Sequence, residues 1–136
     1  MRQSNSVLLI YTGGTIGMYK TNEGSLRPFD LDTLSTQIPE LKTFDIDINA
    51  ISIVQPIDSS NMSKKVWIQL AEIIEKEYNN YNGFVILHGS DTMAYTASAL
   101  SFMLENLNKP VILTGAQLPI GVRRTDAKEN IITSIE

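Results

Sequence analysis

Three short apolar runs, each followed by a polar residue and glycine, constrain the fold of this chain more than any other feature. The runs, with the polar residues that end them, cover residues 7–12, 84–88 and 111–114, and glycine follows at positions 13, 89 and 115. Unbroken runs of Val, Ile and Leu are typical of parallel strands that are covered on both faces. Ligands of open α/β sheets bind beyond the carboxyl ends of the strands, so the sequence predicts one polar pocket where these runs end.

Helical periodicity and turn residues predict the elements around these strands. We expect helices over 31–38, 63–78, 92–107 and 126–136, a strand over 44–53 with a bulge near 49–50, and a glycine-containing lid loop over 13–24. In the helix over 92–107, Met103 and Leu107 are expected to face the core. The order strand, helix, strand, helix, strand within residues 44–114 implies parallel pairing and an α/β fold class.

Composition limits the partners that this chain is expected to bind. Its 136 residues suit one compact domain, and 43% hydrophobic against 19% charged residues is typical of globular proteins. A net charge of -4 without a large basic cluster argues against nucleic acid or an anionic membrane surface, and no apolar run is long enough to span a membrane. A small-molecule substrate is therefore expected. With no cysteine and one histidine, no metal site is expected, and the cytoplasm is the expected compartment.

The glycine-containing turns also have purely structural interpretations. Segment 12–15 lacks the spacing of a dinucleotide-binding or phosphate-binding loop, so no cofactor is expected there. His88 is interpreted as a structural hydrogen-bonding residue, and residues 58–60 are compatible with an ordinary Asx-type turn. Ser90 or Asp91 can cap the helix after them, a role compatible with catalysis at the positive end of the helix dipole.

Taken together, four segments resemble the bacterial cytoplasmic, type I L-asparaginase family. They are residues 11–18, 58–62, 83–97 and 110–117, and their order spans nearly the whole chain. The resemblance implies a three-layer α/β/α N-terminal domain with a mainly parallel sheet. It also implies hydrolysis of L-asparagine to L-aspartate and ammonia through an acyl-enzyme, without cofactor or metal, in a homodimer or homotetramer.

The same resemblance implies roles for individual residues. Thr15 matches the nucleophile, Ser90 the second catalytic threonine, and Asp91 the carboxylate that binds the substrate ammonium. Backbone N–H groups near Ser90 would stabilise the tetrahedral oxyanion. The remaining implied substrate contacts are Asp58, Ser59, Ser60 and the backbone of Ala116.

This chain departs from the family pattern in three ways. Ser90 stands where the family has threonine, and Ser25 stands about where related enzymes have a loop tyrosine, which makes Tyr19 the candidate helper on that loop. The family's proton-relaying lysine and its smaller C-terminal domain lie beyond this sequence. We therefore expect residues 1–136 to be a partial N-terminal asparaginase domain that is inactive or nearly so by itself.

Two alternatives to an asparaginase stay open on the sequence alone. The family's catalytic domain also occurs in an amidotransferase subunit that releases ammonia for tRNA-bound glutamate, where an extra N-terminal domain precedes it. Because the first strand of this chain begins at Val7, that alternative is disfavoured. The other alternative is a non-catalytic remnant that binds a small amino acid without turnover.

Overall fold

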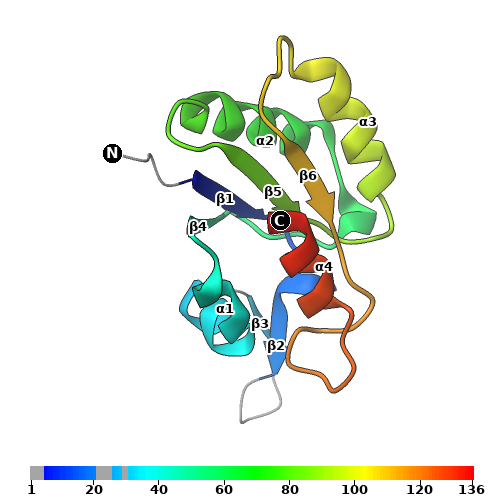
Figure 1. The fold of residues 1–136 in the computed structure, drawn as a ribbon. Coiled ribbons are helices and arrows are strands. Elements are labelled where there is room, and N and C mark those ends of the chain that lie inside the picture. Colours follow the sequence, from blue (N-terminus) through cyan, green and yellow to red (C-terminus); the bar gives the residue numbers. More distant parts are fainter. Residues whose placement is uncertain (1–4, 21–25, 29–30) are drawn as a thin grey trace.

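The chain forms three layers around a parallel sheet (Figure 1). The computed structural model describes residues 5–20, 26–28 and 31–136. Its main sheet has the strand order β4-β1-β5-β6, and each neighbouring pair is parallel. The strands are β1 (Asn5–Tyr11), β4 (Ile46–Ser52), β5 (Gly83–Leu87) and β6 (Val111–Thr114). The predicted α/β class and parallel pairing are confirmed.

Two hydrophobic clusters explain why the strand sequences are apolar without alternation. Leu8 and Ile10 of β1 pack on one face of the sheet, under α2 (Lys64–Glu77) and α3 (Met93–Met103). Leu9 and Tyr11 pack on the other face, under α1 (Leu31–Gln37) and α4 (Ala127–Ile135). Because helices cover both faces, successive residues of a central strand are all buried. The three-layer prediction is therefore confirmed.

The predicted bulge in β4 is wrong. β1 and β4 pair at seven consecutive positions, from Asn5 with Ile46 to Tyr11 with Ser52, with no extra residue on either strand. Ala50 packs toward the α1 side of the sheet with Ile46 and Ile48, while Ile51 is 38% exposed on the other side. β4 is an edge strand in the described sheet, so an exposed isoleucine there does not require a change of register. A 3-10 helix, η2 (Pro39–Thr43), precedes the strand and delays its start to Ile46.

The segment expected to be a lid loop contains regular structure. A short 3-10 helix, η1 (Thr15–Gly17), follows β1. The strands β2 (Met18–Lys20) and β3 (Leu26–Pro28) then pair antiparallel as a second, two-stranded sheet. Strands of three residues carry too little periodicity to be recognised in a sequence, so the sequence alone does not predict this hairpin. Gly24 and Ser25 lie outside the described residues.

α3 is shorter than predicted and its last residues are not buried. The helix ends at Met103 rather than at residue 107, and the backbone of Leu104 is extended. Met103 is 39% exposed and Leu107 is 41% exposed, so neither faces the core as expected. Asn106 adopts a left-handed conformation at φ 54°, which turns the chain back toward α2 before β6 begins. The amide N–H of Asn108 then donates to the hydroxyl of Tyr78, at the end of α2.

Candidate active site

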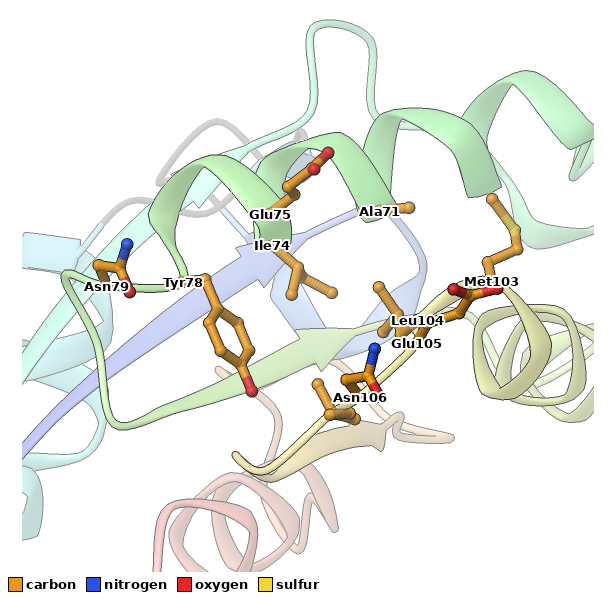
Figure 2. A pocket seen from close by; sticks show the side chains of 10 residues that line it. Ala71, Ile74, Glu75, Tyr78, Asn79, Met103, Leu104, Glu105 and Asn106 are labelled. Carbon is orange, nitrogen blue, oxygen red and sulfur yellow. The ribbon is translucent and has the colours of Figure 1, made fainter.

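A cavity of about 520 Å³ opens at the carboxyl ends of the central strands. Loops after β1, β4 and β5 line it, as expected for an open α/β sheet. Five of the residues implied as site residues are in its lining: Thr15, Asp58, Ser59, Ser90 and Asp91. A cavity of similar volume, about 550 Å³, lies between α2 and the end of α3 and contains none of them (Figure 2). The candidate active site is therefore the cavity at the strand ends.

Direct backbone contact between loops brings these residues together. Gly14 has a φ of 81°, and a Cβ on it would lie 2.6 Å from the backbone of Gly89. Gly13 has a φ of 123°, and a Cβ there would lie 2.0 Å from the carbonyl oxygen of Ile57. Only glycine satisfies both the positive φ and the close approach. The two glycines after β1 thus place Thr15 beside the loops that carry the other site residues.

Hydrogen bonds fix the same three loops to one another. The amide of Thr12 donates to the Leu87 carbonyl at 3.0 Å, which joins the ends of β1 and β5. The amide of Ile57 donates to the Thr12 carbonyl at 2.9 Å, which attaches the loop after β4. Thr92, at the start of α3, donates its hydroxyl to the Ser59 carbonyl at 2.7 Å. Backbone groups therefore hold most of the cavity wall in place. The side chains that line the cavity are available for other chemistry.

Asp58 shapes the loop after β4. One carboxylate oxygen accepts from the amide of Ser60 at 2.9 Å and from its hydroxyl at 2.8 Å. This confirms the Asx-type turn, at the start of the 3-10 helix η3 (Ser59–Asn61). The hydrogen bonds from the Ser60 amide and hydroxyl hold the pKa of the Asp58 carboxyl below its usual value, so it is charged at neutral pH. Asp58 is thus both a turn residue and a negative group at the cavity.

Ser90 and Asp91 lie at the N-terminal end of α3, where both are exposed and line the cavity. The N-cap residue of α3 is Thr92, and no side chain caps that position. The capping interpretation of Ser90 and Asp91 is therefore wrong. Both precede the first turn of an 11-residue helix, whose unpaired N–H groups give this end partial positive charge.

His88 lies behind the cavity in a continuous hydrogen-bond chain. Its side chain is fully buried, its Nδ1 lies 2.7 Å from the Gly89 carbonyl, and its Nε2 lies 2.8 Å from the Thr96 hydroxyl. The indole of Trp67 also donates to that hydroxyl, at 2.9 Å. A carbonyl only accepts and an indole only donates, so neutral His88 carries its proton on Nδ1 and accepts from Thr96. Burial lowers the pKa of His88, and the structural interpretation of this residue is confirmed.

Tyr11 is a cavity residue that the sequence analysis does not single out. Its ring packs against Gly17, and its hydroxyl donates to the carbonyl of Gly14 at 3.1 Å. Burial raises the pKa of Tyr11 to about 12, so the phenol is protonated at neutral pH. A tyrosine that ends a strand of aliphatic residues needs a partner for its buried hydroxyl. This requirement is the sequence feature that points to Tyr11.

Three implied residues do not join the described cavity lining. Ser60 is exposed, and its hydroxyl is bound to Asp58. Ala116 is buried in the hydrophobic cluster on the α4 side of the sheet. The backbone of Tyr19 lies in β2, but its side chain lies outside what the structure describes. Within the described residues, no three His, Asp or Glu side chains are grouped in a way that could hold a metal ion.

Comparison with known proteins identifies a family for this chain. Residues 6–136 match the family model described as asparaginase, N-terminal. L-asparaginase 1 of Escherichia coli is 45% identical over 135 residues, which are 98% of this chain and 40% of that protein. A 60 kDa lysophospholipase of Mus musculus is 43% identical over 158 residues, covering 99% of this chain and 28% of that protein.

A solved structure agrees with the sequence comparison. The thermostable L-asparaginase from Thermococcus kodakarensis superposes with a TM-score of 0.87 at 35% identity, covering 96% of this chain and 39% of that one. The chain thus spans about 40% of the length of these asparaginases. Its fold and its sequence lead to the same conclusion: the chain belongs to the asparaginase family and corresponds to the asparaginase N-terminal domain.

Proposed function

We propose that this chain is the nucleophile-bearing part of an amidohydrolase that converts L-asparagine to L-aspartate and ammonia. The observation that carries the proposal is the presence of Thr15, Ser90 and Asp91 in the lining of one cavity. A hydroxyl, a second hydroxyl and a carboxylate are the groups needed to attack an amide and to bind an α-amino acid. The asparaginases among the relatives support the choice of asparagine.

In the proposed reaction, Thr15 Oγ attacks the side-chain amide carbon of asparagine. The hydroxyl proton passes to the amide nitrogen, the C–N bond breaks, ammonia leaves and an aspartyl ester forms on Thr15. Water then attacks the ester, aspartate leaves, and a proton returns to Thr15 Oγ. Ser90 is proposed to move the proton together with a lysine outside this chain. Backbone N–H groups near Ser90 and the positive end of α3 favour the oxyanion.

The polar side chains of the cavity offer a contact for each end of an amino acid. The Asp91 carboxylate would bind the substrate ammonium, and Ser59 would donate to the substrate carboxylate. Ser59 is buried, and its Oγ would lie 2.4 Å from a Cβ placed on Gly89, so it is held against the loop that carries Ser90 and Asp91. Asp58, Ser60 and the backbone of Ala116 remain proposed contacts, and Tyr19 remains the proposed loop helper.

The wider context of the reaction is also a proposal. We expect a homodimer or homotetramer, a cytoplasmic location, and no cofactor or metal in the reaction. Within the described residues, no helix combines the length and apolar character needed to cross a bilayer. Residues 1–136 alone are expected to release little or no ammonia, because the proton-relaying lysine of the family lies outside them.

A chimera tests the proposal. The matched region of Escherichia coli L-asparaginase 1, at 45% identity, is replaced by this chain. Ammonia release is measured with asparagine and glutamine, with and without tRNA-bound glutamate, and fatty-acid release is measured with a lysophospholipid. We expect turnover of asparagine. A chimera that melts cooperatively and binds asparagine without releasing ammonia would support the binding remnant instead. Fatty-acid release from the lysophospholipid without ammonia from asparagine would favour lysophospholipid hydrolysis, which the name of the mouse relative describes. Ammonia release only in the presence of tRNA-bound glutamate would favour the amidotransferase subunit.

A further inference from the structure

The side chain of Tyr11 contacts both ends of the turn that carries the proposed nucleophile. Its hydroxyl donates to the carbonyl of Gly14 at 3.1 Å, and Gly14 directly precedes Thr15. At the other end of the turn, a Cβ on Gly17 would lie 2.3 Å from a ring carbon of Tyr11, so the backbone of Gly17 lies directly against the ring. The 3-10 helix η1 is therefore held between the hydroxyl and the ring of one side chain.

The hydroxyl of Tyr11 acts on the peptide group that leads into Thr15. The Gly14 carbonyl and the Thr15 amide belong to one planar group, so a hydrogen bond to the carbonyl restricts rotation of the whole group. Glycine has the widest conformational freedom of any residue, so Gly14 by itself restricts that rotation little. The direction of the Thr15 side chain therefore depends on the group that holds the Gly14 carbonyl.

The surroundings of Tyr11 suit it to hold the turn and not to take a proton. β1, which ends at Tyr11, pairs with β4 on one side and with β5 on the other, so the side chain starts from a rigid element. Tyr11 is 1% exposed, and burial raises its pKa to about 12, so the phenol remains a hydrogen-bond donor at neutral pH. Ile16 of the turn is buried in the same hydrophobic cluster as the ring, and this packing does not need the hydroxyl.

We infer that Tyr11 is a positioning residue for the proposed nucleophile: its hydroxyl fixes the Gly14–Thr15 peptide group so that Thr15 Oγ faces the cavity. Tyr11 and Thr15 both line that cavity, with Ser90 and Asp91. The inference rests on the proposed function and adds to it a residue that acts through the backbone. Small displacements of a reacting group lower the rate of the chemical step steeply, so the effect is expected in kcat more than in KM.

Tyr11→Phe tests the inference in the chimera with Escherichia coli L-asparaginase 1, because it removes the hydroxyl and keeps the ring against Gly17. We expect kcat for asparagine to fall by at least about tenfold while KM stays within about twofold. The pH profile of kcat should keep its shape, because Tyr11 stays protonated below its pKa of about 12.

Tyr78→Phe is the matched control. The hydroxyl of Tyr78, at the C-terminal end of α2, donates to the Asn108 side chain at 2.6 Å and accepts from the Asn108 amide at 2.9 Å. The control therefore also removes a phenol hydroxyl that forms hydrogen bonds, but in the other cavity (Figure 2). Its kcat should stay within about twofold of the unmodified chimera, and both variants should melt cooperatively because each keeps its ring.

Amide hydrogen exchange in residues 1–136, followed by NMR, measures the same contact without any activity. The amide of Met18 donates to the Thr15 carbonyl and closes the turn. Loss of one hydrogen bond of ordinary strength should raise the exchange rate of this amide by roughly two- to tenfold in Tyr11→Phe. In Tyr78→Phe the exchange rate of the same amide should be unchanged.

The two measurements separate this inference from the proposed function. Faster exchange at Met18 together with a lower kcat in Tyr11→Phe would support it. Unchanged exchange, a kcat within about twofold of the unmodified chimera, a pH profile of altered shape, or an equal loss of kcat in Tyr78→Phe would each overturn it. A chimera that releases no ammonia in its unmodified form would contradict the proposed function, and the exchange rate at Met18 would then decide whether Tyr11 holds the turn.

Discussion

Three side chains behind the cavity form a hydrogen-bond chain that restricts the protonation state of the histidine within it. Trp67 donates to Thr96, Thr96 donates to His88, and His88 donates to the carbonyl of Gly89. Gly89 in turn lies against Gly14 and Ser59. Protonation of His88 would add a second donor against the Thr96 hydroxyl and place a charge in a fully buried position. The position of the loop that carries Ser90 and Asp91 is thus coupled to a neutral histidine.

The pH dependence of stability tests this residue. Burial lowers the pKa of folded His88, whereas in the unfolded chain it keeps the ordinary value of 6.5. The unfolded state therefore binds more protons below that pH, and stability, complete above pH 6.5, is lost as pH falls toward the folded pKa. We expect the free energy of unfolding to fall by up to about 1.4 kcal/mol per pH unit there. Because His88 is the chain's one histidine, an NMR titration of its Cε1–H is unambiguous, and a pKa at or above 6.5 would contradict the neutral, buried state.

The glycine that admits the loop after β5 gives a second prediction at this scale. Gly14→Ala adds a Cβ at a φ of 81° and within 2.6 Å of the Gly89 backbone. We expect the free energy of unfolding in urea to drop by roughly 2 kcal/mol or more. Gly121→Ala is the control, since the nearest atom to its added Cβ is Gln37 Oε1 at 4.0 Å, and a change under about 1 kcal/mol is expected. Equal losses of unfolding free energy in both variants would show that the close approach of Gly14 to Gly89 does not require glycine.

At the scale of elements, the strands could be predicted and the ends of elements could not. β1 and β5 are buried on both faces, and their unbroken apolar runs indicate this burial in the sequence. The end of α3 depends on Asn106 and on the hydrogen bonds between Asn108 and Tyr78. Neither can be recognised from helical periodicity in the sequence. The cavity could be foreseen from the polar residues and glycines after each strand. For Tyr11, the sequence indicates only a buried hydroxyl that needs a partner, because the identity of that partner depends on a loop that folds back over the ring.

The contact between α2 and α3 carries a prediction of its own. Thr96→Val keeps the shape of the side chain but removes the hydroxyl that serves both Trp67 and His88. Leaving these groups without their partner should cost roughly 1–3 kcal/mol of the free energy of unfolding. Thr133→Val, at an exposed position of α4, should stay within about 0.5 kcal/mol. Denaturant unfolding of both variants makes the comparison, and equal stability would show that the hydrogen-bond chain does not stabilise the fold.

At the scale of the whole molecule, the chain joins two surfaces of different character. The strand-end cavity is polar and is held together by backbone contacts between three loops. The outer face of α3, which includes Phe102, is uncharged along the helix, and the groove beside it carries Glu75 and Glu105. The two surfaces share α3, because Ser90 and Asp91 precede its first turn and Phe102 lies in its last.

The most direct test of the proposed nucleophile is covalent. The chimera with the Escherichia coli enzyme is mixed with asparagine, quenched in acid within milliseconds, digested and analysed by mass spectrometry. We predict a transient aspartyl ester on the peptide that contains Thr15. We also predict that Thr15→Ala abolishes the ester and lowers turnover by at least about a thousandfold while the variant still melts cooperatively. An aspartyl ester on Ser90, or near-normal turnover by the Thr15→Ala variant, would contradict the assignment of Thr15 as the nucleophile.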